Sequence, residues 1–110
     1  MFKKTNRLTK VEFDEFYKTG LKKHFPHLTI ITKPLQKTKT SVVVGKKVAK
    51  SAVRRNTLRR RVYATLKRVD TDNKSLGGII IILKPSYNSL TRKAAEEFLK
   101  QSIAQVLKGA

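Results

Sequence analysis

Seven carboxylates and two histidines are the side chains of this sequence that could support acid–base or metal-dependent chemistry. A protein that cleaves phosphodiester bonds by itself needs carboxylates clustered around two metal ions, or histidines placed as acid and base. The acidic residues instead fall into separate groups, at positions 12, 14 and 15, at 70 and 72, and at 96 and 97. His24 and His27 flank a Phe-Pro turn, where surface histidines are expected. Asp70-Thr71-Asp72-Asn73 begins like a calcium loop but lacks its glycine and distal glutamate. We therefore expect neither a catalytic residue nor a metal site in the protein itself.

The segment 52–61 reads Ala-Val-Arg-Arg-Asn-Thr-Leu-Arg-Arg-Arg, and its charge follows a helical period. At 100° per residue, an apolar stripe that can bury against a sheet is formed by Leu58, Val62, Leu66 and Val69. Two polar rows lie beside it, one of Arg54, Arg61 and Arg68 and one of Asn56, Arg60 and Lys67. A solvated helix face usually mixes charge signs, but positions 54–68 contain no acid. The pattern predicts a helix that binds a polyanion.

Arginine suits this role because its planar fork of donors can grip a phosphate with two bonds and stack on unpaired bases. Arg55 and Arg59 are like charges four residues apart, which favours a ligand that offsets their repulsion. Asn56 could contact the polyanion, cap the helix, or help to position a metal ion held mainly by phosphates of the polyanion. The residues predicted to bind the polyanion, which include lysines of the preceding loop, are Lys46, Lys47, Lys50, Arg54, Arg55, Asn56, Arg59, Arg60, Arg61 and Arg68.

Twenty-six basic residues against seven acidic ones give the 110-residue chain a formal net charge of +19. Self-repulsion of this size destabilises an isolated compact state, so a polyanionic partner is expected. A membrane surface is the rival polyanion, but the charge is spread through predicted helices and loops of a domain with a core, which favours nucleic acid. The chain has no cysteine, no long apolar segment and no signal peptide. We expect a soluble cytoplasmic protein without disulfides.

The elements that must position these residues follow from periodicity and turn residues. Thr9 and Glu12 predict a capping box that begins a helix over 10–19, with Gly20 as its stop. Short strands are expected over 21–24, 28–32 and 41–44, forming a small antiparallel meander. The basic helix should run from Ser51 to about 69, followed by a loop over 70–77 and a buried strand over 78–83. A last helix opens at Ser89 or Thr91. The order αβββαβα predicts an α/β sandwich, with helices packed on one sheet, and a single domain over 1–110.

Three blocks of this sequence resemble the protein subunit of bacterial ribonuclease P. The first is Asn6-Arg7-Leu8 leading into a helix with Phe13 and Tyr17, and the second is 42–47 followed by 52–60. The third is the strand and turn over 79–85. The core at 55–60 reads Arg-Asn-x-x-Arg-Arg, similar to the family's Arg-Asn-x-x-Lys-Arg. With the order of elements, the resemblance covers nearly the whole chain.

The resemblance implies a mixed four-stranded sheet with a left-handed βαβ crossover, in which the basic helix follows a strand and leads to a parallel one. It implies that this helix faces the catalytic RNA of ribonuclease P, through Arg54, Arg55, Asn56, Arg59, Arg60 and Arg61. That RNA cleaves the precursor with Mg²⁺, bound mainly by the RNA, so the protein is the non-catalytic subunit of a ribonucleoprotein endonuclease.

The resemblance also implies a second partner, the 5′ leader of precursor tRNA, in a cleft between the first helix and the sheet. Phe13 and Tyr17 are the candidates for stacking on leader bases, although aromatic residues four apart on a helix commonly pack into a core. The aromatic residue that usually floors this cleft is replaced here by Ile30 or Ile31.

Three other functions are compatible with parts of the sequence. A structural RNA-binding protein, such as a ribosomal component, would share the charge and size but needs no leader cleft. A DNA-binding module would present the arginine-rich helix to a major groove, and it would require a dimer or a helix-turn-helix. We expect neither DNA nor a membrane as partner. A stand-alone nuclease would cut RNA without an RNA partner.

Overall fold

The computed structural model describes residues 8–34, 39–73 and 77–108, with the side chains of 70–73 and 107–108 left out. The elements are α1 (Lys10–Thr19), β1 (Leu21–His24), β2 (Leu28–Lys33), β3 (Lys39–Val43), α2 (Ala52–Asn73), β4 (Gly78–Leu83), the short 3₁₀ helix η2 (Pro85–Ser89) and α3 (Arg92–Lys108). This confirms the predicted order αβββαβα, to which the structure adds η2. No helix in the described part of the chain has the length and apolar character needed to cross a bilayer.

The four strands form one mixed sheet in the order β1-β2-β4-β3. β2 pairs antiparallel with β1 and with β4, whereas β3 pairs parallel with β4. The predicted antiparallel meander of the first three strands is therefore wrong, because β4 lies between β2 and β3. β4 is a nearly continuous apolar run, which is typical of a strand covered on both faces. The parallel pair joined by a helix, implied by the family resemblance, is confirmed.

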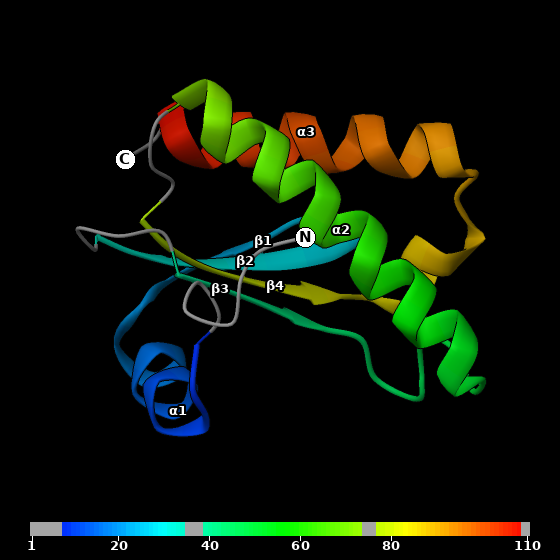
Figure 1. The fold of residues 1–110 in the computed structure, drawn as a ribbon, viewed down its shortest axis with the longest axis horizontal. Coiled ribbons are helices and arrows are strands. Elements are labelled where there is room, and N and C mark those ends of the chain that lie inside the picture. The colour runs from blue at the N-terminus through cyan, green and yellow to red at the C-terminus, as the bar shows by residue number, and fades with distance from the viewer. Residues whose placement is uncertain (1–7, 35–38, 74–76, 109–110) are drawn as a thin grey trace.

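Helices cover both faces of the sheet: α2 and α3 lie on one face and α1 lies on the other (Figure 1). The larger apolar core lies between the sheet and the two long helices. Leu58, Val62 and Leu66 of α2 are almost fully buried in it, and Val69 packs against it. The predicted apolar stripe of the basic helix is thus confirmed, and its burial fixes which side of α2 faces outward.

The structure corrects the predicted end of α2 and decides between the two predicted starts of α3. α2 continues to Asn73, so the predicted end near 69 is wrong. Adding a residue to an existing helix is much easier than starting one, so residues of weak helix propensity can extend it. At the start of α2, the Ser51 hydroxyl accepts a hydrogen bond from the Arg54 amide at 3.3 Å, as predicted. At α3 the cap is Thr91, whose hydroxyl accepts from the Ala94 amide at 3.2 Å.

α1 is held on its face of the sheet by a small apolar cluster and by polar contacts at its first turn. Phe16 is buried against Ile31 and Ile80. The predicted capping box is confirmed: the Glu12 amide donates to the Thr9 hydroxyl at 3.2 Å, and the Thr9 amide donates to the Glu12 carboxylate at 3.0 Å. The same carboxylate pairs with Lys39 of β3 at 2.9 Å. Phe16 therefore anchors the second half of α1 to the sheet, and the ion pair between Glu12 and Lys39 anchors its first turn.

Gly20 ends α1 as predicted, but its backbone is not left-handed, since φ is −71°. Glycine is needed here because neighbouring atoms come too close for a side chain: a Cβ at this position would lie 2.6 Å from Ile31 Cγ2 and 2.7 Å from the Phe16 carbonyl oxygen. We expect Gly20→Ala to lower the free energy of unfolding by about 1–3 kcal/mol, as overpacking does. Urea unfolding in sulfate buffer, which screens the net charge, measures this.

Gly45→Ala is the matched control for Gly20→Ala. A Cβ at Gly45 meets no atom within 4 Å. This substitution should be neutral or stabilise by up to about 1 kcal/mol through the unfolded state. Equal unfolding midpoints for the two variants would contradict the assigned role of Gly20.

The pKa of Glu12 is lowered, first by the hydrogen bond from the Thr9 amide and then by Lys39. Because the pKa of Glu12 is lower in the folded state than in the unfolded state, the ionised carboxylate stabilises the folded protein. This contribution is complete above the unfolded-state pKa, near 4.5, and it is lost as the pH falls through the folded-state pKa. We therefore expect the unfolding midpoint to decrease below pH 4.5, with a shallower decrease in Glu12→Gln, which cannot titrate. Parallel pH profiles from chemical unfolding of the two proteins would rule out this contribution.

Candidate nucleic-acid interface

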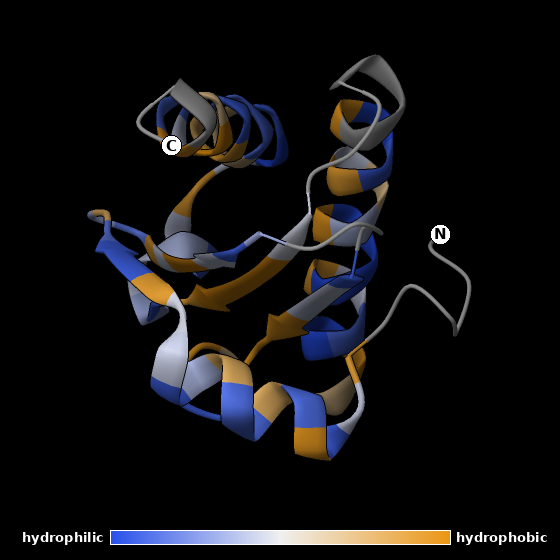
Figure 2. Ribbon diagram, turned by 90° about the vertical axis from the view of Figure 1, so that its left-hand side faces the viewer, coloured by the Kyte–Doolittle hydropathy of each residue, from blue (hydrophilic) through white to orange (hydrophobic). Residues whose placement is uncertain are grey.

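The outward side of α2 and the turn before it form one continuous basic surface. The apolar side of the long helix at the right of Figure 2 faces the sheet, and its hydrophilic side faces solvent. Asn56 and Arg60 are exposed on this outer side. Lys46, Lys47 and Lys50 are exposed in the turn, which is closed by a hydrogen bond from the Val48 amide to the Gly45 carbonyl at 3.0 Å. The predicted RNA-binding residues of the turn and the helix therefore lie on adjoining surface.

Arg55 and Arg59 are half-buried and make specific protein contacts. Arg55 Nη1 donates to the carbonyl oxygens of Ala49 at 2.9 Å and Lys50 at 2.8 Å, so it closes the loop before the helix. Arg59 Nη1 donates to Asn56 Oδ1 at 2.6 Å. Arg55 thus holds the basic turn in place, and Asn56 orients a neighbouring guanidinium group.

The row of Arg54, Arg61 and Arg68 faces the groove between α2 and α3. Arg54 Nε donates to Asn88 Oδ1 at 2.9 Å, and Asn88 Nδ2 donates to the Val48 carbonyl at 3.1 Å. Arg68 pairs with Glu96 at 2.6 Å, and Lys100 approaches the same carboxylate at 3.6 Å. The sequence did not predict Asn88 or Glu96 as part of this surface, because both belong to elements far along the chain from α2.

Phe13 and Tyr17 lie side by side on α1, with ring centroids 6.1 Å apart and planes inclined by 23°. Phe13 is half-buried against the cluster of Phe16, Ile31 and Ile80, whereas Tyr17 is 43% exposed. With Asp14 and Lys18 they line a hollow on the surface of α1. The predicted packing role is therefore confirmed for Phe13, whereas stacking on leader bases stays a prediction, for which Tyr17 offers an accessible ring.

The side-chain ammonium group of Lys22 contacts the aromatic pair, with its Nζ 4.1 Å from the centroid of the Tyr17 ring. Lys22 is on β1, opposite Ile31 in the sheet register. Ile31 belongs to the α1 side of the sheet and is buried against Phe16, whereas Ile30 belongs to the larger core on the other side. Of the two candidates for the missing cleft aromatic, Ile31 is thus the residue beneath α1.

The described acidic residues and histidines lie in separate groups on the fold. Among the residues that the structure describes, no group of three or more histidine, aspartate and glutamate side chains is placed to hold a metal ion. His24 Nδ1 lies 3.1 Å from the Thr29 hydroxyl, and His27 Nδ1 lies 2.8 Å from the Ser86 hydroxyl. Each described histidine is therefore engaged in a local hydrogen bond.

A family model described as Ribonuclease P matches residues 2–107, which is nearly the whole chain. The chain belongs to the bacterial ribonuclease P protein family. Membership supports a role in ribonuclease P and in tRNA processing, and it implies an RNA partner. No curated protein matches the sequence closely enough to count as a relative.

Solved structures of ribonuclease P proteins share this fold. The Thermotoga maritima protein is 21% identical, with a TM-score of 0.75 over 90% of this chain and 96% of its own. The Staphylococcus aureus protein is 19% identical, with a TM-score of 0.72 over 94% of this chain and 95% of its own. At these sequence identities the similarity shows a shared fold only. The shared fold agrees with the predicted four-stranded mixed sheet and three helices.

Proposed function

We propose that this chain is the RNA-binding protein subunit of ribonuclease P, which assists a catalytic RNA in removing the 5′ leader from precursor tRNA. The observation that carries the proposal is the separation of two surfaces in a chain of this family. Positions 54–68 of α2 carry an arginine-rich face and contain no acidic residue. An accessible aromatic pair lies on α1, which covers the opposite face of the sheet from α2 (Figure 1). Two such surfaces suit a protein that binds a large RNA and a short single strand at the same time.

The α2 surface and its turn bind the catalytic RNA through phosphates. Its exposed cations are Lys46, Lys47, Lys50, Arg60 and the outer parts of Arg59, Arg61 and Arg68. If about six phosphates are neutralised, counterion release predicts a loss of roughly 10³ in affinity between ~50 and ~200 mM salt. This interaction also relieves the self-repulsion of a chain with a net charge of +19.

The aromatic pair binds the 5′ leader. Tyr17 offers an accessible ring face, and Phe13 stands beside it in a nearly parallel orientation. Stacking on unpaired bases tolerates many sequences, as a subunit that serves many precursors requires. Lys22, next to the Tyr17 ring, supplies a cation for the leader backbone.

The chemistry is carried by the RNA. Mg²⁺ that activates the attacking water is bound mainly by RNA phosphates, and the protein's side chains bind and position the two RNAs. The proposal places this reaction in the cytoplasm, where precursor tRNA is made in bacteria.

Multiple-turnover cleavage of a 5′-extended precursor tRNA at low Mg²⁺ tests the proposal. The catalytic RNA alone, the protein alone and the two together are compared. The proposal expects strong cleavage only in the combination. Cleavage by the protein alone would show a stand-alone nuclease. Tight binding of structured RNA without stimulation of cleavage would favour the alternative function of a structural RNA-binding protein.

A further inference from the structure

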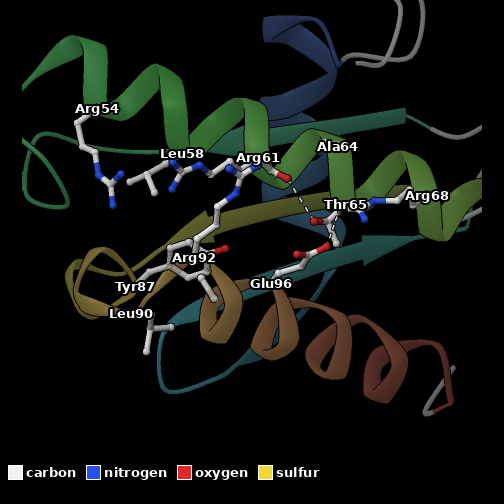
Figure 3. Close-up of a pocket in the computed structure, with 11 residues that line it drawn as sticks. Arg54, Leu58, Arg61, Ala64, Thr65, Arg68, Tyr87, Leu90, Arg92 and Glu96 are labelled. Atoms are coloured by element: carbon white, nitrogen blue, oxygen red, sulfur yellow. Dashed lines mark hydrogen bonds and ion pairs between the residues drawn. The ribbon is translucent and has the colours of Figure 1, made fainter.

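A cavity lies between α2, η2 and α3 (Figure 3). These helices cover the opposite face of the sheet from α1, which carries the aromatic pair (Figure 1). Its apolar lining is formed by Leu58, Ala64, Tyr87, Leu90 and Ala95. Its polar lining is formed by Arg54, Arg61, Thr65, Arg68, Arg92 and Glu96. The lining therefore combines an apolar part with charged groups from both long helices.

Tyr87 and Thr65 are the two almost fully buried polar residues of this lining, and the Thr65 hydroxyl donates to the Arg61 carbonyl at 3.2 Å. Tyr87 is 4% exposed, and its side chain extends into the space between α2 and α3 (Figure 3). Its hydroxyl makes no hydrogen bond to any residue that the structure describes, although buried tyrosine hydroxyls usually have a partner. Burial raises the pKa of Tyr87 to about 12, so the hydroxyl keeps its proton and remains a donor at neutral pH.

The charge around the cavity is strongly positive. Four arginines line it against one carboxylate, Glu96. Arg54 and Arg68 already have protein partners, in Asn88 and Glu96. Within the described residues, the guanidinium groups of Arg61 and Arg92 donate to no protein acceptor. They remain available for an anionic group at the rim of the cavity.

The size of the cavity limits its occupant. Its volume is about 60 Å³, less than half that of the ~150 Å³ apolar cavity that binds benzene. It therefore admits the edge of one nucleobase and is too small for a whole base or a stacked pair of bases. A free phosphate would be held by the arginines at the rim but would leave the apolar floor uncovered.

We propose that this cavity receives the edge of the base of one unstacked RNA nucleotide, whose flanking phosphates bind Arg61 and Arg92. The Tyr87 hydroxyl donates to a heteroatom at that edge, and the apolar floor packs against it. Bases that are turned out of an RNA stack are recognised in this way, between apolar or aromatic surfaces and arginine planes. The inference rests on the proposed RNA-binding function for its biological ligand. It adds a base-binding site in the groove between α2 and α3, which adjoins the outer face of α2 and shares Arg61 with it.

Nuclear magnetic resonance of the full chain with ¹³C-labelled alanine methyl groups tests this site without the catalytic RNA. The probes are AMP and ribose 5-phosphate, which share a phosphate and differ by the base. We expect AMP to shift the Ala95 methyl resonance through the ring current of the base, and ribose 5-phosphate to leave it nearly unchanged. Tyr87→Phe should weaken AMP binding about three- to tenfold, the effect of one hydrogen bond.

Two alanine substitutions make the test specific to the cavity. Ala64 is exposed and lines the cavity, so Ala64→Leu should fill its mouth without disturbing the core and abolish the AMP response. Ala104→Leu, at an exposed position of α3 outside the lining, should preserve it.

Three results would overturn the base site: equal shifts from AMP and ribose 5-phosphate, a full AMP response in Ala64→Leu, or no response at Ala95 at millimolar AMP. None of them affects the cleavage assay. A failed titration together with protein-dependent cleavage would therefore remove the cavity inference and leave the proposed function in place.

Discussion

Arg60→Glu should lower the affinity for the catalytic RNA about 10- to 100-fold and leave the free energy of unfolding unchanged. Arg60 is exposed on the outer side of α2, and its side chain makes no hydrogen bond or ion pair with a described residue. A charge-assisted hydrogen bond to phosphate contributes about 1.5–3 kcal/mol, and the introduced carboxylate adds repulsion. Filter binding at several salt concentrations measures the affinity, and the slope of log affinity against log salt should decrease by about 1.

Lys93→Glu is the control for this charge reversal. Lys93 is exposed on α3, and its substitution changes the net charge of the protein by the same amount. It should alter RNA affinity only through long-range electrostatics, which salt screens. If both variants lost the same affinity, the α2 face would have no special role. Arg55 is unsuitable for such a test, because its guanidinium group holds the carbonyl oxygens of Ala49 and Lys50 and its loss would also loosen the turn.

The helical period of the basic segment was enough to predict which side of α2 is buried. Leu58, Val62 and Leu66 are spaced by four residues, and the structure buries all three against the sheet. The capping box of α1 was equally predictable, because Thr9 and Glu12 satisfy each other's backbone within four residues. Both features are local, so sequence spacing determines them.

The strand order could not be read from the same local signals. Residues 28–44 contain two strands close in sequence, which favours a hairpin, yet β2 and β3 are separated by β4. Burial of the apolar strand β4 on both faces and the path of α2 decide this arrangement, and β4 follows β3 by more than thirty positions. The cavity between α2 and α3 was missed for the same reason, because Tyr87 and Glu96 reach it only through the fold.

Replacing both rings of the aromatic pair by leucine should weaken binding of precursor tRNA to the assembled enzyme about 10- to 1000-fold. Base–aromatic stacking contributes about 1–3 kcal/mol per base, and the two rings lie close enough to engage neighbouring bases of a leader. Leucine keeps apolar volume at Phe13, which packs against Phe16 and Ile31, so Phe13→Leu with Tyr17→Leu should preserve the fold. Affinity is measured for precursors whose leaders differ in length.

The dependence on leader length separates a leader site from a packing role. If the rings stack on leader bases, the loss should grow with the number of leader nucleotides and vanish for mature tRNA, which has none. Val11→Ala, at a 76% exposed position of the same helix, should leave all these affinities unchanged. An equal loss for mature tRNA would mean that the pair acts through the stability of α1. A leader-dependent loss is the expected result, because Tyr17 and the neighbouring Lys22 lie at the surface, where an RNA strand can reach them.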